Sequence, residues 1–353
     1  MKLTHGGDWA GYIEEYGKEP LDYSSNVSPL GIPEGVKRAA AEAMERADRY
    51  PDPLCRQLKA ALSRTWGVPA DRILCGNGAS DLILRVARGL APKRALVTAP
   101  TFSEYEEALA KAGCACDHFP LKEEDDFRVT EEILGWIGPE LDLLILCEPN
   151  NPTGRTTDPA LLRRILARCG ETGVLLMVDE CFMEFLTDRE RHTLVGELAA
   201  HPELLILRAF TKSFAMAGLR LGYLLCGSAE TAAAIEAAGQ PWAVSVPAQE
   251  AGIAALKEAG FLEEMRALTA RERTRMMARM EALGLRVIPG EADYLLFDSG
   301  DPELGDALRE KGILIRDCSN YIGLRAGWYR AAVKREEQND AFLQALTEVI
   351  NNG

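Results

Sequence analysis

The sequence predicts an α/β protein in which a mainly parallel sheet lies between layers of helices. From residue 73 onward, short apolar runs alternate with helix-forming stretches. The runs lack an alternation of polar and apolar residues, which is typical of strands buried on both faces. The composition of the 353-residue chain, 47% hydrophobic and 27% charged, is that of a globular protein large enough for two domains.

The expected elements follow in order along the chain. Two amphipathic helices come first, Glu34–Arg49 and Leu54–Trp66. Six strands are then predicted, namely Ile73–Cys75, Ala95–Ala99, Leu141–Cys147, Val174–Val178, Leu204–Leu207 and Leu221–Cys226. The helices predicted between them are Ala79–Leu90, Ser103–Ala112, Pro159–Cys169 and Ala229–Ala238. Strands joined by helices predict parallel pairing in one sheet.

Three parts of the chain are distinguished by these patterns. Residues 1–30 are polar and rich in Gly, Ser and Pro, and are predicted to form an extended arm. Residues 31–284 are predicted to form the large domain, whose first helix is a candidate to pack with the small domain, and 285–353 the small α+β domain. The stretch Pro247–Leu283 is nearly all helix-forming, with breaks expected at Gly252 and Gly260.

The small domain is predicted from a changed order of elements after residue 284. Its expected strands are Arg286–Ile288, Tyr294–Phe297, Ile313–Arg316 and Tyr329–Val333. Its expected helices are Pro302–Lys311 and Glu336–Ile350. Strands and helices grouped in this way are typical of a compact α+β unit.

The charge and cysteine content exclude several classes of protein. With 54 acidic and 40 basic residues the net charge is −14, which argues against nucleic acid or an anionic membrane as a partner. No apolar run reaches the length of a membrane span, and no apolar leader follows Met1. Nine scattered cysteines indicate a reduced, cytoplasmic location. Cys114, Cys116 and His118 lack a further ligand pair, so no metal site is expected.

Ligands of open α/β sheets bind beyond the carboxyl ends of the strands, so the residues that follow each strand are the candidates. The first strand is followed by Gly76-Asn77-Gly78-Ala79-Ser80 and then a helix. Glycines allow close backbone approach, and a helix N-terminus offers N–H groups to a phosphate near Ala79 and Ser80. A tight turn with a helix cap would give the same pattern. The dinucleotide fingerprint is incomplete, because Asp81 occupies the place of its third glycine.

Two further strand ends carry residues suited to a flat ligand. Phe102 follows the second strand and is either a core residue or a ring that stacks on a ligand. Asn151 lies in the turn Asn150-Asn151-Pro152-Thr153-Gly154. That turn is either only a tight connection or a rigid support that directs an amide at a ligand oxygen.

The remaining strand ends carry an acid and a lysine. Asp179 follows five apolar residues, so it is expected to be buried and to need a cation, either a ring nitrogen or an arginine. Lys212 lies among small and apolar residues. It is either a packed lysine with its amine in solvent or a nucleophile with a depressed pKa that forms a Schiff base. Together, sites for a phosphate, a ring, a ring oxygen, a ring cation and an aldehyde match pyridoxal 5′-phosphate.

The order of these motifs resembles the fold type I pyridoxal-phosphate enzymes, the class I/II aminotransferase superfamily. The matching motifs are Gly76–Ser80, Pro100–Tyr105, Asn150–Gly154, Asp179-Glu180 and Thr211–Tyr223. The resemblance implies a large domain with a mainly parallel seven-stranded sheet. It also implies that Lys212 carries the cofactor as a Schiff base and moves protons, while Asp179 keeps the ring nitrogen protonated.

The resemblance assigns further roles to single positions. Asn151 would bond the phenolic oxygen and Phe102 would stack on the ring. The phosphate would be held by Ala79, Ser80, Thr211 and Arg220. Tyr50, in Arg49-Tyr50-Pro51, resembles a tyrosine that reaches the phosphate of the neighbouring subunit, which implies a homodimer. Arg330 resembles the arginine that binds the substrate carboxylate.

Two groups within the superfamily are similar to this chain: the threonine-phosphate decarboxylases and the histidinol-phosphate aminotransferases. The opening His5-Gly6-Gly7-Asp8, Phe182 and the segment Arg316–Leu324 favour the decarboxylases. In that group the positions of His5, Arg316 and Arg330 contact the phosphate and carboxylate of the substrate. Ser28 stands where both groups usually carry Asn, which leaves the substrate open.

The leading hypothesis is a decarboxylase of O-phospho-L-threonine, or a close analogue, of the kind used in cobalamin biosynthesis. The alternative is an aminotransferase acting on histidinol phosphate or another amino acid. Both would act on a small-molecule amino acid joined to the cofactor as a Schiff base, and the sequence leaves the choice of broken bond open. A non-catalytic relative is disfavoured by the presence of Lys212, Asp179 and Arg220. A nicotinamide dehydrogenase is disfavoured because the third glycine of the dinucleotide fingerprint is missing.

Overall fold

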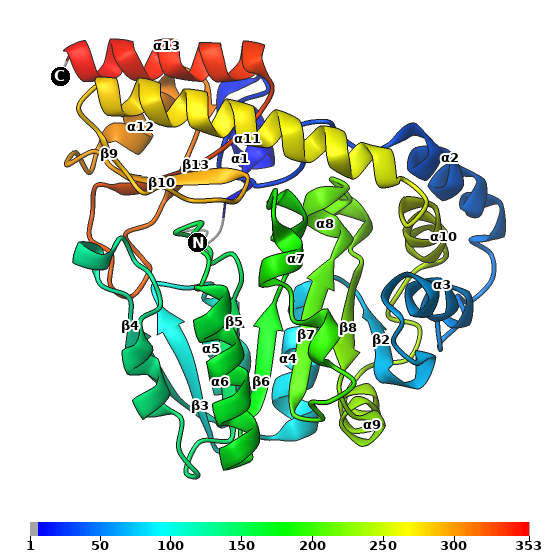
Figure 1. Ribbon diagram of the computed structural model, residues 1–353. Coiled ribbons are helices and arrows are strands. Elements are labelled where there is room, and N and C mark those ends of the chain that lie inside the picture. Colours follow the sequence, from blue (N-terminus) through cyan, green and yellow to red (C-terminus); the bar gives the residue numbers. More distant parts are fainter. Residues whose placement is uncertain (1–5, 353) are drawn as a thin grey trace.

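A seven-stranded sheet lies at the centre of the computed structural model, which describes residues 6–352 (Figure 1). Its spatial order is β2-β8-β7-β6-β5-β3-β4; β8 runs antiparallel to β2 and β7, and the other neighbours pair in parallel. The strands are β2 (Ile73–Gly76), β3 (Arg94–Ala99), β4 (Ala115–Pro120), β5 (Leu143–Cys147), β6 (Leu175–Asp179), β7 (Leu204–Ala209) and β8 (Gly222–Cys226). The predicted α/β fold with a mainly parallel sheet is confirmed.

The central strands are apolar because both faces of the sheet are covered. In β5, Leu144 and Leu146 belong to one hydrophobic cluster, whereas Leu143 and Ile145 belong to another. Successive side chains of a strand point to opposite faces, so the two clusters are the two cores between the sheet and its helices. The continuous apolar runs of the sequence follow from this double burial.

One strand of the sheet was missed by the sequence prediction. β4 includes Asp117 and His118 and is largely half-exposed, because it pairs only with β3 at the edge of the sheet. Edge strands tolerate charged residues, so this one lacks the apolar run by which the inner strands were found.

The helices of this region are α2 (Glu34–Ala43), α3 (Arg56–Trp66), α4 (Ala79–Leu90), α5 (Glu104–Lys111), α6 (Pro159–Thr172), α7 (Arg189–His192), α8 (Phe210–Ser213), α9 (Ala229–Ala237), α10 (Val246–Ala255) and α11 (Ala259–Ala282). Helices α4 to α8 connect successive strands, whereas α2 and α3 precede β2 and α9 to α11 follow β8. Short 3₁₀ turns occupy Met44–Arg46, Ala70–Arg72, Glu123–Asp125, Glu131–Trp136, Met183–Phe185, Val195–Glu197 and Ala217–Leu219. The caps of α6 were readable in the sequence, since Asp158 accepts from the first-turn N–H groups and Gly173 ends the helix at φ 75°.

The long helical stretch after residue 246 is divided at a different place from the one predicted. The break lies between α10 and α11, and both Gly252 and Gly260 are inside helices. A Cβ at Gly252 would approach a methyl carbon of Leu221 to 2.5 Å. This glycine therefore serves close packing and does not end a helix.

The N-terminal segment is less extended than the sequence indicated. Residues 9–16 form helix α1 (Trp9–Tyr16), which begins at an Asp8 cap and ends at Gly17 with φ 67°. After it, β1 (Leu21–Asp22) pairs in parallel with β11 (Ile313–Leu314). The expectation of an extended arm was wrong for α1, because the two caps outweigh the polar composition.

The C-terminal region forms a second sheet in the order β12-β13-β10-β9. Its strands are β9 (Arg286–Val287), β10 (Tyr294–Asp298), β12 (Arg316–Asp317) and β13 (Trp328–Ala332), and its helices are α12 (Leu304–Glu310) and α13 (Glu336–Asn352). The predicted strand 313–316 is instead two short strands, β11 and β12, in different sheets. α11 and α13 lie side by side along this region (Figure 1).

Helix α11 contributes to the cores of both regions. Met265 packs in a cluster of the large sheet, whereas Met276 and Met280 pack with the C-terminal sheet. Tyr23, from the N-terminal segment, also packs in the C-terminal cluster. The division into 1–30, 31–284 and 285–353 stays a prediction. Among residues 6–352, no helix has both the length and the apolar character needed to cross a bilayer.

Candidate active site

The register of the large sheet brings the predicted residues to one edge. Cys147 pairs with Asp179, and Asp179 pairs with Leu207, so β5, β6 and β7 end at nearly the same level. Gly222 of β8 pairs with Gly76 of β2 on one side and with the end of β7 on the other. The segments that follow these strands therefore meet beyond their carboxyl ends, where ligands of such sheets bind.

An anion cradle lies at the N-terminus of α4. Gly78 precedes the helix with φ 81° and gives its first turn no side-chain cap. A Cβ on Gly78 would lie 2.7 Å from Nη2 of Arg220, and a Cβ on Gly222 would lie 2.9 Å from the backbone nitrogen of Ala79. Both glycines thus allow the guanidinium and the helix terminus to approach each other. Uncapped N–H groups beside an arginine fit a phosphate.

Of the two hydroxyl residues predicted for the phosphate, Ser80 lies on the helix of this cradle and Thr211 lies beside Lys212. Ser80 is half-buried in the first turn of α4, and Thr211 is buried in α8 next to Lys212. Ser80 is therefore next to Ala79, and Thr211 is next to Lys212, two residues that were also predicted to contact the cofactor.

Asp179 is a buried carboxylate at the end of β6, only 4% exposed. It accepts hydrogen bonds from the Tyr105 hydroxyl at 2.6 Å and from the backbone nitrogen of Cys181 at 2.9 Å. Burial raises its pKa, and these bonds and the charge of Lys212 oppose the rise. Across residues 6–352 no arginine or lysine forms an ion pair with it, so the carboxylate is suited to a ligand cation such as a ring nitrogen.

Tyr105 is a site residue to which the sequence assigned no role. Its hydroxyl fixes Asp179, and its ring meets that of the half-buried Phe102 edge to face with centroids 5.6 Å apart. The spacing of three residues between Phe102 and Tyr105, at the start of a helix, was the available signal. Phe102 and Asp179 are therefore connected through one side chain.

Lys212 lies in α8, and its nitrogen lies near an aromatic ring. Nζ is 5.2 Å from the ring centroid of Phe182, and burial lowers the pKa of the amine. The backbone carbonyl of Lys212 accepts a hydrogen bond from the nitrogen of the buried Ser28 at 2.8 Å. Ser28 thus supports the lysine through its backbone. An amine with a lowered pKa is a suitable nucleophile for an aldehyde.

Asn151 and Arg330 contact each other across the two regions. Arg330, 6% exposed, donates through Nη1 to Oδ1 of Asn151 and through Nη2 to the carbonyl of Ser24 at 3.0 Å. Its buried Nε has no partner among the described residues. The Tyr321 hydroxyl also donates to Asn151 Oδ1, at 3.5 Å. Because these acceptors are neutral, Arg330 keeps its charge available for an anion.

The second predicted arginine is close to the first. Arg316 is buried, donates through Nη2 to Oδ1 of Asn320 at 2.8 Å, and lies 5.4 Å from the ring centroid of Tyr321. Phe102, Asn320 and Tyr321 line one small pocket. Tyr321 thus contacts both Arg316 and Asn151, and Asn151 in turn contacts Arg330. Phe102 lines the same pocket as Tyr321.

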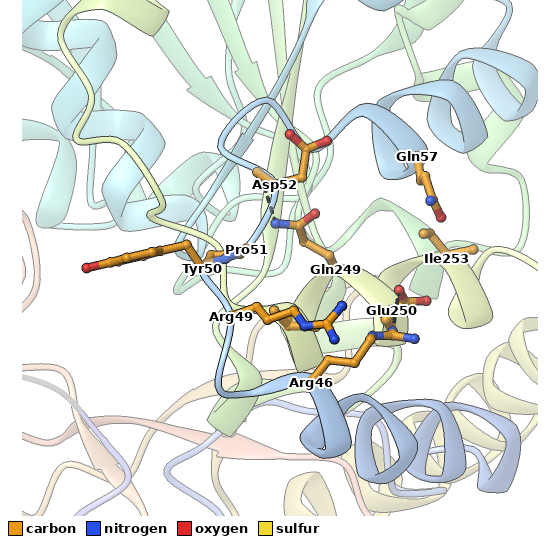
Figure 2. A pocket seen from close by; sticks show the side chains of 10 residues that line it. Arg46, Arg49, Tyr50, Pro51, Asp52, Gln57, Gln249, Glu250 and Ile253 are labelled. Carbon is orange, nitrogen blue, oxygen red and sulfur yellow. Dashed lines mark hydrogen bonds and ion pairs between the residues drawn. The ribbon is translucent and has the colours of Figure 1, made fainter.

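One predicted residue, Tyr50, is not part of this assembly, and another, His5, is not among the described residues. Tyr50 is 82% exposed, and its ring meets that of Trp242 with centroids 5.0 Å apart. Figure 2 shows it directed away from a surface pocket that is also lined by Arg46 and Arg49. His5 lies outside the described residues, so its predicted contact with substrate stays a prediction.

The expectation of no metal site also stays a prediction. His118 lies within 3.4 Å of Glu106 and not in a group of metal-ligating side chains. Within residues 6–352, Asp188, His192 and Glu291 bring ligand atoms within 4.8 Å of one another.

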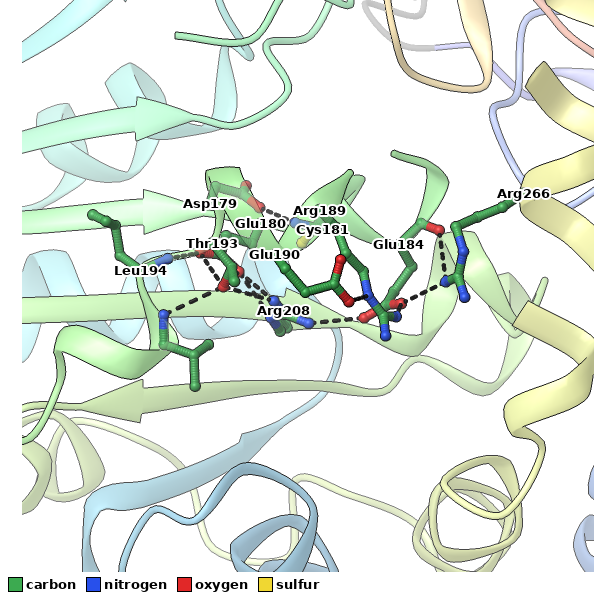
Figure 3. Close-up of polar contacts among 11 residues, drawn as sticks. Asp179, Glu180, Cys181, Glu184, Arg189, Glu190, Thr193, Leu194, Arg208 and Arg266 are labelled. Atoms are coloured by element: carbon green, nitrogen blue, oxygen red, sulfur yellow. Dashed lines mark hydrogen bonds and ion pairs between the residues drawn. The ribbon is translucent and has the colours of Figure 1, made fainter. Parts of the chain in front are cut away.

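A buried ion network supports the ends of β6 and β7 (Figure 3). Glu180 accepts from Arg208 Nε at 3.0 Å and from the backbone nitrogen of Leu194 at 3.0 Å. Arg208 also donates to Glu184 at 2.9 Å and stacks over the Trp66 ring at 4.1 Å. Asp179 precedes Glu180 directly, so this network fixes the backbone that carries it.

Comparison with known proteins gives consistent matches over nearly the whole chain. The family model described as aminotransferase class I and II matches residues 18–346. Threonine-phosphate decarboxylase of Salmonella typhimurium is 38% identical over 353 residues, covering 98% of this chain and 96% of that protein. Histidinol-phosphate aminotransferase of Clostridium acetobutylicum has a crystal structure with a TM-score of 0.88 at 33% identity, covering 94% of this chain and 100% of that one.

A third relative was solved with a cofactor. Histidinol-phosphate aminotransferase of Sinorhizobium meliloti, in complex with pyridoxal-5′-phosphate, has a TM-score of 0.87 at 26% identity. It covers 99% of this chain, and this chain covers 96% of it.

The ion network leads to a stability prediction. Glu180→Ala leaves Arg208 buried with one acid fewer, which is expected to cost about 3–5 kcal/mol. Glu190→Ala removes an exposed carboxylate that pairs with Arg189 in the same network, and is expected to cost at most about 1 kcal/mol. Urea unfolding at one protein concentration measures both values. Equal losses in the two variants would contradict the structural role given to Glu180.

Proposed function

Because the chain belongs to the aminotransferase class I and II family, whose members use pyridoxal 5′-phosphate, we propose that it decarboxylates O-phospho-L-threonine or a close analogue. The chain is an enzyme of the group that contains pyridoxal-phosphate decarboxylases and aminotransferases. The similarity to a threonine-phosphate decarboxylase over 98% of the chain supports the choice of reaction. The observation that carries the proposal is the charge of Arg330, buried beside Arg316 and bonded to neutral acceptors.

The cofactor would be held by the residues gathered at the sheet edge. Ala79, Ser80, Thr211 and Arg220 would hold its phosphate, while Phe102 would lie against its ring and Asn151 would donate to its ring oxygen. Support comes from the uncapped α4 terminus and from Asp179, which forms no ion pair with a lysine or arginine among residues 6–352. When bound, the cofactor supplies a sink for the electrons released at Cα.

The side chains of this protein would then decide which bond at Cα breaks. Arg330 binds the substrate carboxylate, and Arg316, with His5 and the segment around Ser28, receives its phosphate. The bond that these anchors hold perpendicular to the ring is the one that breaks. The Lys212 side chain, in its ammonium form, would supply the proton that Cα receives after carbon dioxide leaves, whereas in transamination its neutral amine would first take the proton from Cα. Tyr105 keeps Asp179 directed at the ring nitrogen.

An aminotransferase acting on histidinol phosphate is the second candidate. It is supported by the 0.88 TM-score and 33% identity to a histidinol-phosphate aminotransferase. The two reactions would use the same lysine and the same ring site, so they differ in how the arginines orient the substrate.

A homodimer and a cytoplasmic location complete the proposal. Tyr50 would reach the cofactor phosphate of the partner subunit. Support comes from large hydrophobic side chains that are exposed to solvent. Met44, Tyr50 and Leu54 are close to one another in the chain, and the exposed Trp242 contacts the ring of Tyr50. The location is supported by the nine cysteines, which are all unbridged.

The first test of the proposal is a substrate assay. Holoenzyme with O-phospho-L-threonine is expected to release carbon dioxide and form 1-aminopropan-2-yl phosphate without a 2-oxoacid. L-Threonine is the matched control, because it lacks the group that Arg316 would bind. Formation of glutamate from 2-oxoglutarate and histidinol phosphate, with no carbon dioxide from phosphothreonine, would overturn decarboxylation in favour of transamination.

The phosphate cradle gives a second prediction. Arg220→Gln is expected to weaken cofactor binding by roughly 10–100-fold, because a charge-assisted hydrogen bond is worth about 1.5–3 kcal/mol. Arg88→Gln, at the exposed end of the same helix, is expected to bind as the wild type does. Absorbance titration of the apoprotein with cofactor measures both affinities. An unchanged affinity in Arg220→Gln would disprove this role.

The shared site gives a third prediction. Tyr50→Ala and Lys212→Ala each damage a different component of every site, so each homodimer is expected to lose activity. After subunit exchange, a mixture of the two is expected to regain roughly a quarter of wild-type activity, because half of the dimers then hold one intact site. Activity equal to the mean of the two parents would show that Tyr50 serves only its own subunit.

A further inference from the structure

Asp293 is a buried carboxylate for which the proposed reaction has no role. It is 0% exposed, and neither of its oxygens has a hydrogen-bond partner among the described residues. Its backbone is fixed at the start of β10, where the carbonyl accepts from the nitrogen of Val333 at 2.7 Å. An unpaired carboxylate in such a place is costly. Its presence therefore needs an explanation in the charges around it.

Tyr294, the next residue in the chain after Asp293, connects it to the candidate active site. The Tyr294 ring lies 5.3 Å from the guanidinium carbon of Arg330 and meets the Phe182 ring edge to face at 5.1 Å. Phe182 also contacts Lys212, whose Nζ is 5.2 Å from the Phe182 ring centroid. The Tyr294 hydroxyl donates to the carbonyl of Asn150 at 2.8 Å. This bond connects β10 to the turn that contains Asn150 and Asn151. Asp293 thus directly precedes the strand whose first residue, Tyr294, lies against Arg330 and contacts the ring of Phe182, which in turn contacts Lys212.

Cations from four segments act on Asp293. Lys212 comes from α8, Arg330 from β13, Lys334 from the residues after β13, and Arg273 from α11. Arg273 donates to the carbonyls of the two residues before Asp293, at 2.8 and 3.0 Å. None of these cations hydrogen-bonds to the carboxylate. The group is therefore surrounded by positive charge without being locked to any one partner.

The effect of these charges is mutual. Burial raises the pKa of Asp293 from its ordinary 3.8 to about 6, while Lys212, Arg330 and Lys334 oppose the rise, so the group is ionised at neutral pH. Burial lowers the pKa of Lys212, and Asp293 opposes that change, whereas Arg330 reinforces it. Without the carboxylate, less negative charge would offset the repulsion between Lys212 and Arg330.

We propose that Asp293 is a positioning residue, the shared counter-charge of Lys212 and Arg330, and that through Lys212 it favours the protonated form of the cofactor Schiff base. A direct ion pair would hold the lysine away from the cofactor and would neutralise the arginine before substrate arrives. A charge at a distance stabilises both cations and leaves their nitrogens available. This inference rests on the proposed roles of Lys212 and Arg330.

The main test measures the Schiff base and not turnover. In Asp293→Asn holoenzyme, the pH midpoint of the cofactor absorbance change is expected to fall by about one unit, because a nearby negative charge is removed. Asp298→Asn is the matched control: it lies at the other end of β10, bonds to Arg325 at 3.0 Å, and is expected to leave the midpoint unchanged. Asp293→Glu keeps the negative charge, so its midpoint is expected to lie close to that of the wild type. A midpoint in Asp293→Asn equal to the wild type would overturn the proposal.

A second measurement uses the apoprotein, so it is independent of cofactor and substrate. Because the folded-state pKa of Asp293 is raised, the folded protein binds the proton more tightly, and this carboxylate lowers stability as pH rises from about 4 to 6. We therefore expect the urea midpoint of Asp293→Asn to rise relative to that of the wild type between about pH 4 and pH 6. Above this interval the difference between the two midpoints is expected to be constant. A difference that does not vary with pH would show that no buried charge is present, which would overturn the proposal.

The two measurements also separate this inference from the proposed reaction. An enzyme that transaminates instead of decarboxylating would give the same absorbance and stability results. A protein whose absorbance change survives Lys212→Ala would contradict the assignment of the cofactor lysine, and with it this inference, whatever the substrate assay gives.

Discussion

The alignment of parallel strands at their carboxyl ends is the constraint on which the candidate site depends. Because β5, β6 and β7 pair in register, the asparagine turn, Asp179 and Lys212 emerge at the same edge of the sheet. The antiparallel β8 lies between β7 and β2, so its first residue, Gly222, faces the start of α4. Hydrophobic clusters on both faces hold this register, and the site needs no long loop to bring its parts together.

Burial of charge is the main cost of the arrangement, and the chain offsets it in two ways. Glu180 and Arg208 satisfy each other completely within a network that includes Thr193 and Leu194, so they act as a rigid support. Asp179, Arg330 and Asp293 are treated differently: each is buried with neutral partners or with none. The Glu180–Arg208 ion pair fixes the backbone. The other three side chains carry charges that no ion pair neutralises, so these charges can interact with a ligand. The net charge of the chain, −14, gives no indication of either arrangement of buried charges.

Most of the large domain could be predicted because its strands are continuous apolar runs, and the cofactor residues follow them directly. β4 was missed because an edge strand has no such run, and α1 was missed because its caps lie within a polar segment. Tyr105 and Asp293 escaped for another reason. Their significance depends on what lies opposite them in space, and a single sequence contains neither the hydrogen bond to Asp179 nor the cations around Asp293.

The contact between Asn151 and Arg330 explains why one scaffold can serve two reactions. Asn151 belongs to the large sheet and is expected to touch the cofactor, whereas Arg330 belongs to the C-terminal sheet and is expected to hold the substrate carboxylate. Tyr321, which also bonds Asn151, carries the same connection to Arg316. Substrate orientation therefore depends on how the C-terminal sheet sits against the cofactor edge. On the proposed roles, a small change in that packing would rotate the substrate about Cα without altering the cofactor residues, so chains with the same lysine and aspartate would break different bonds.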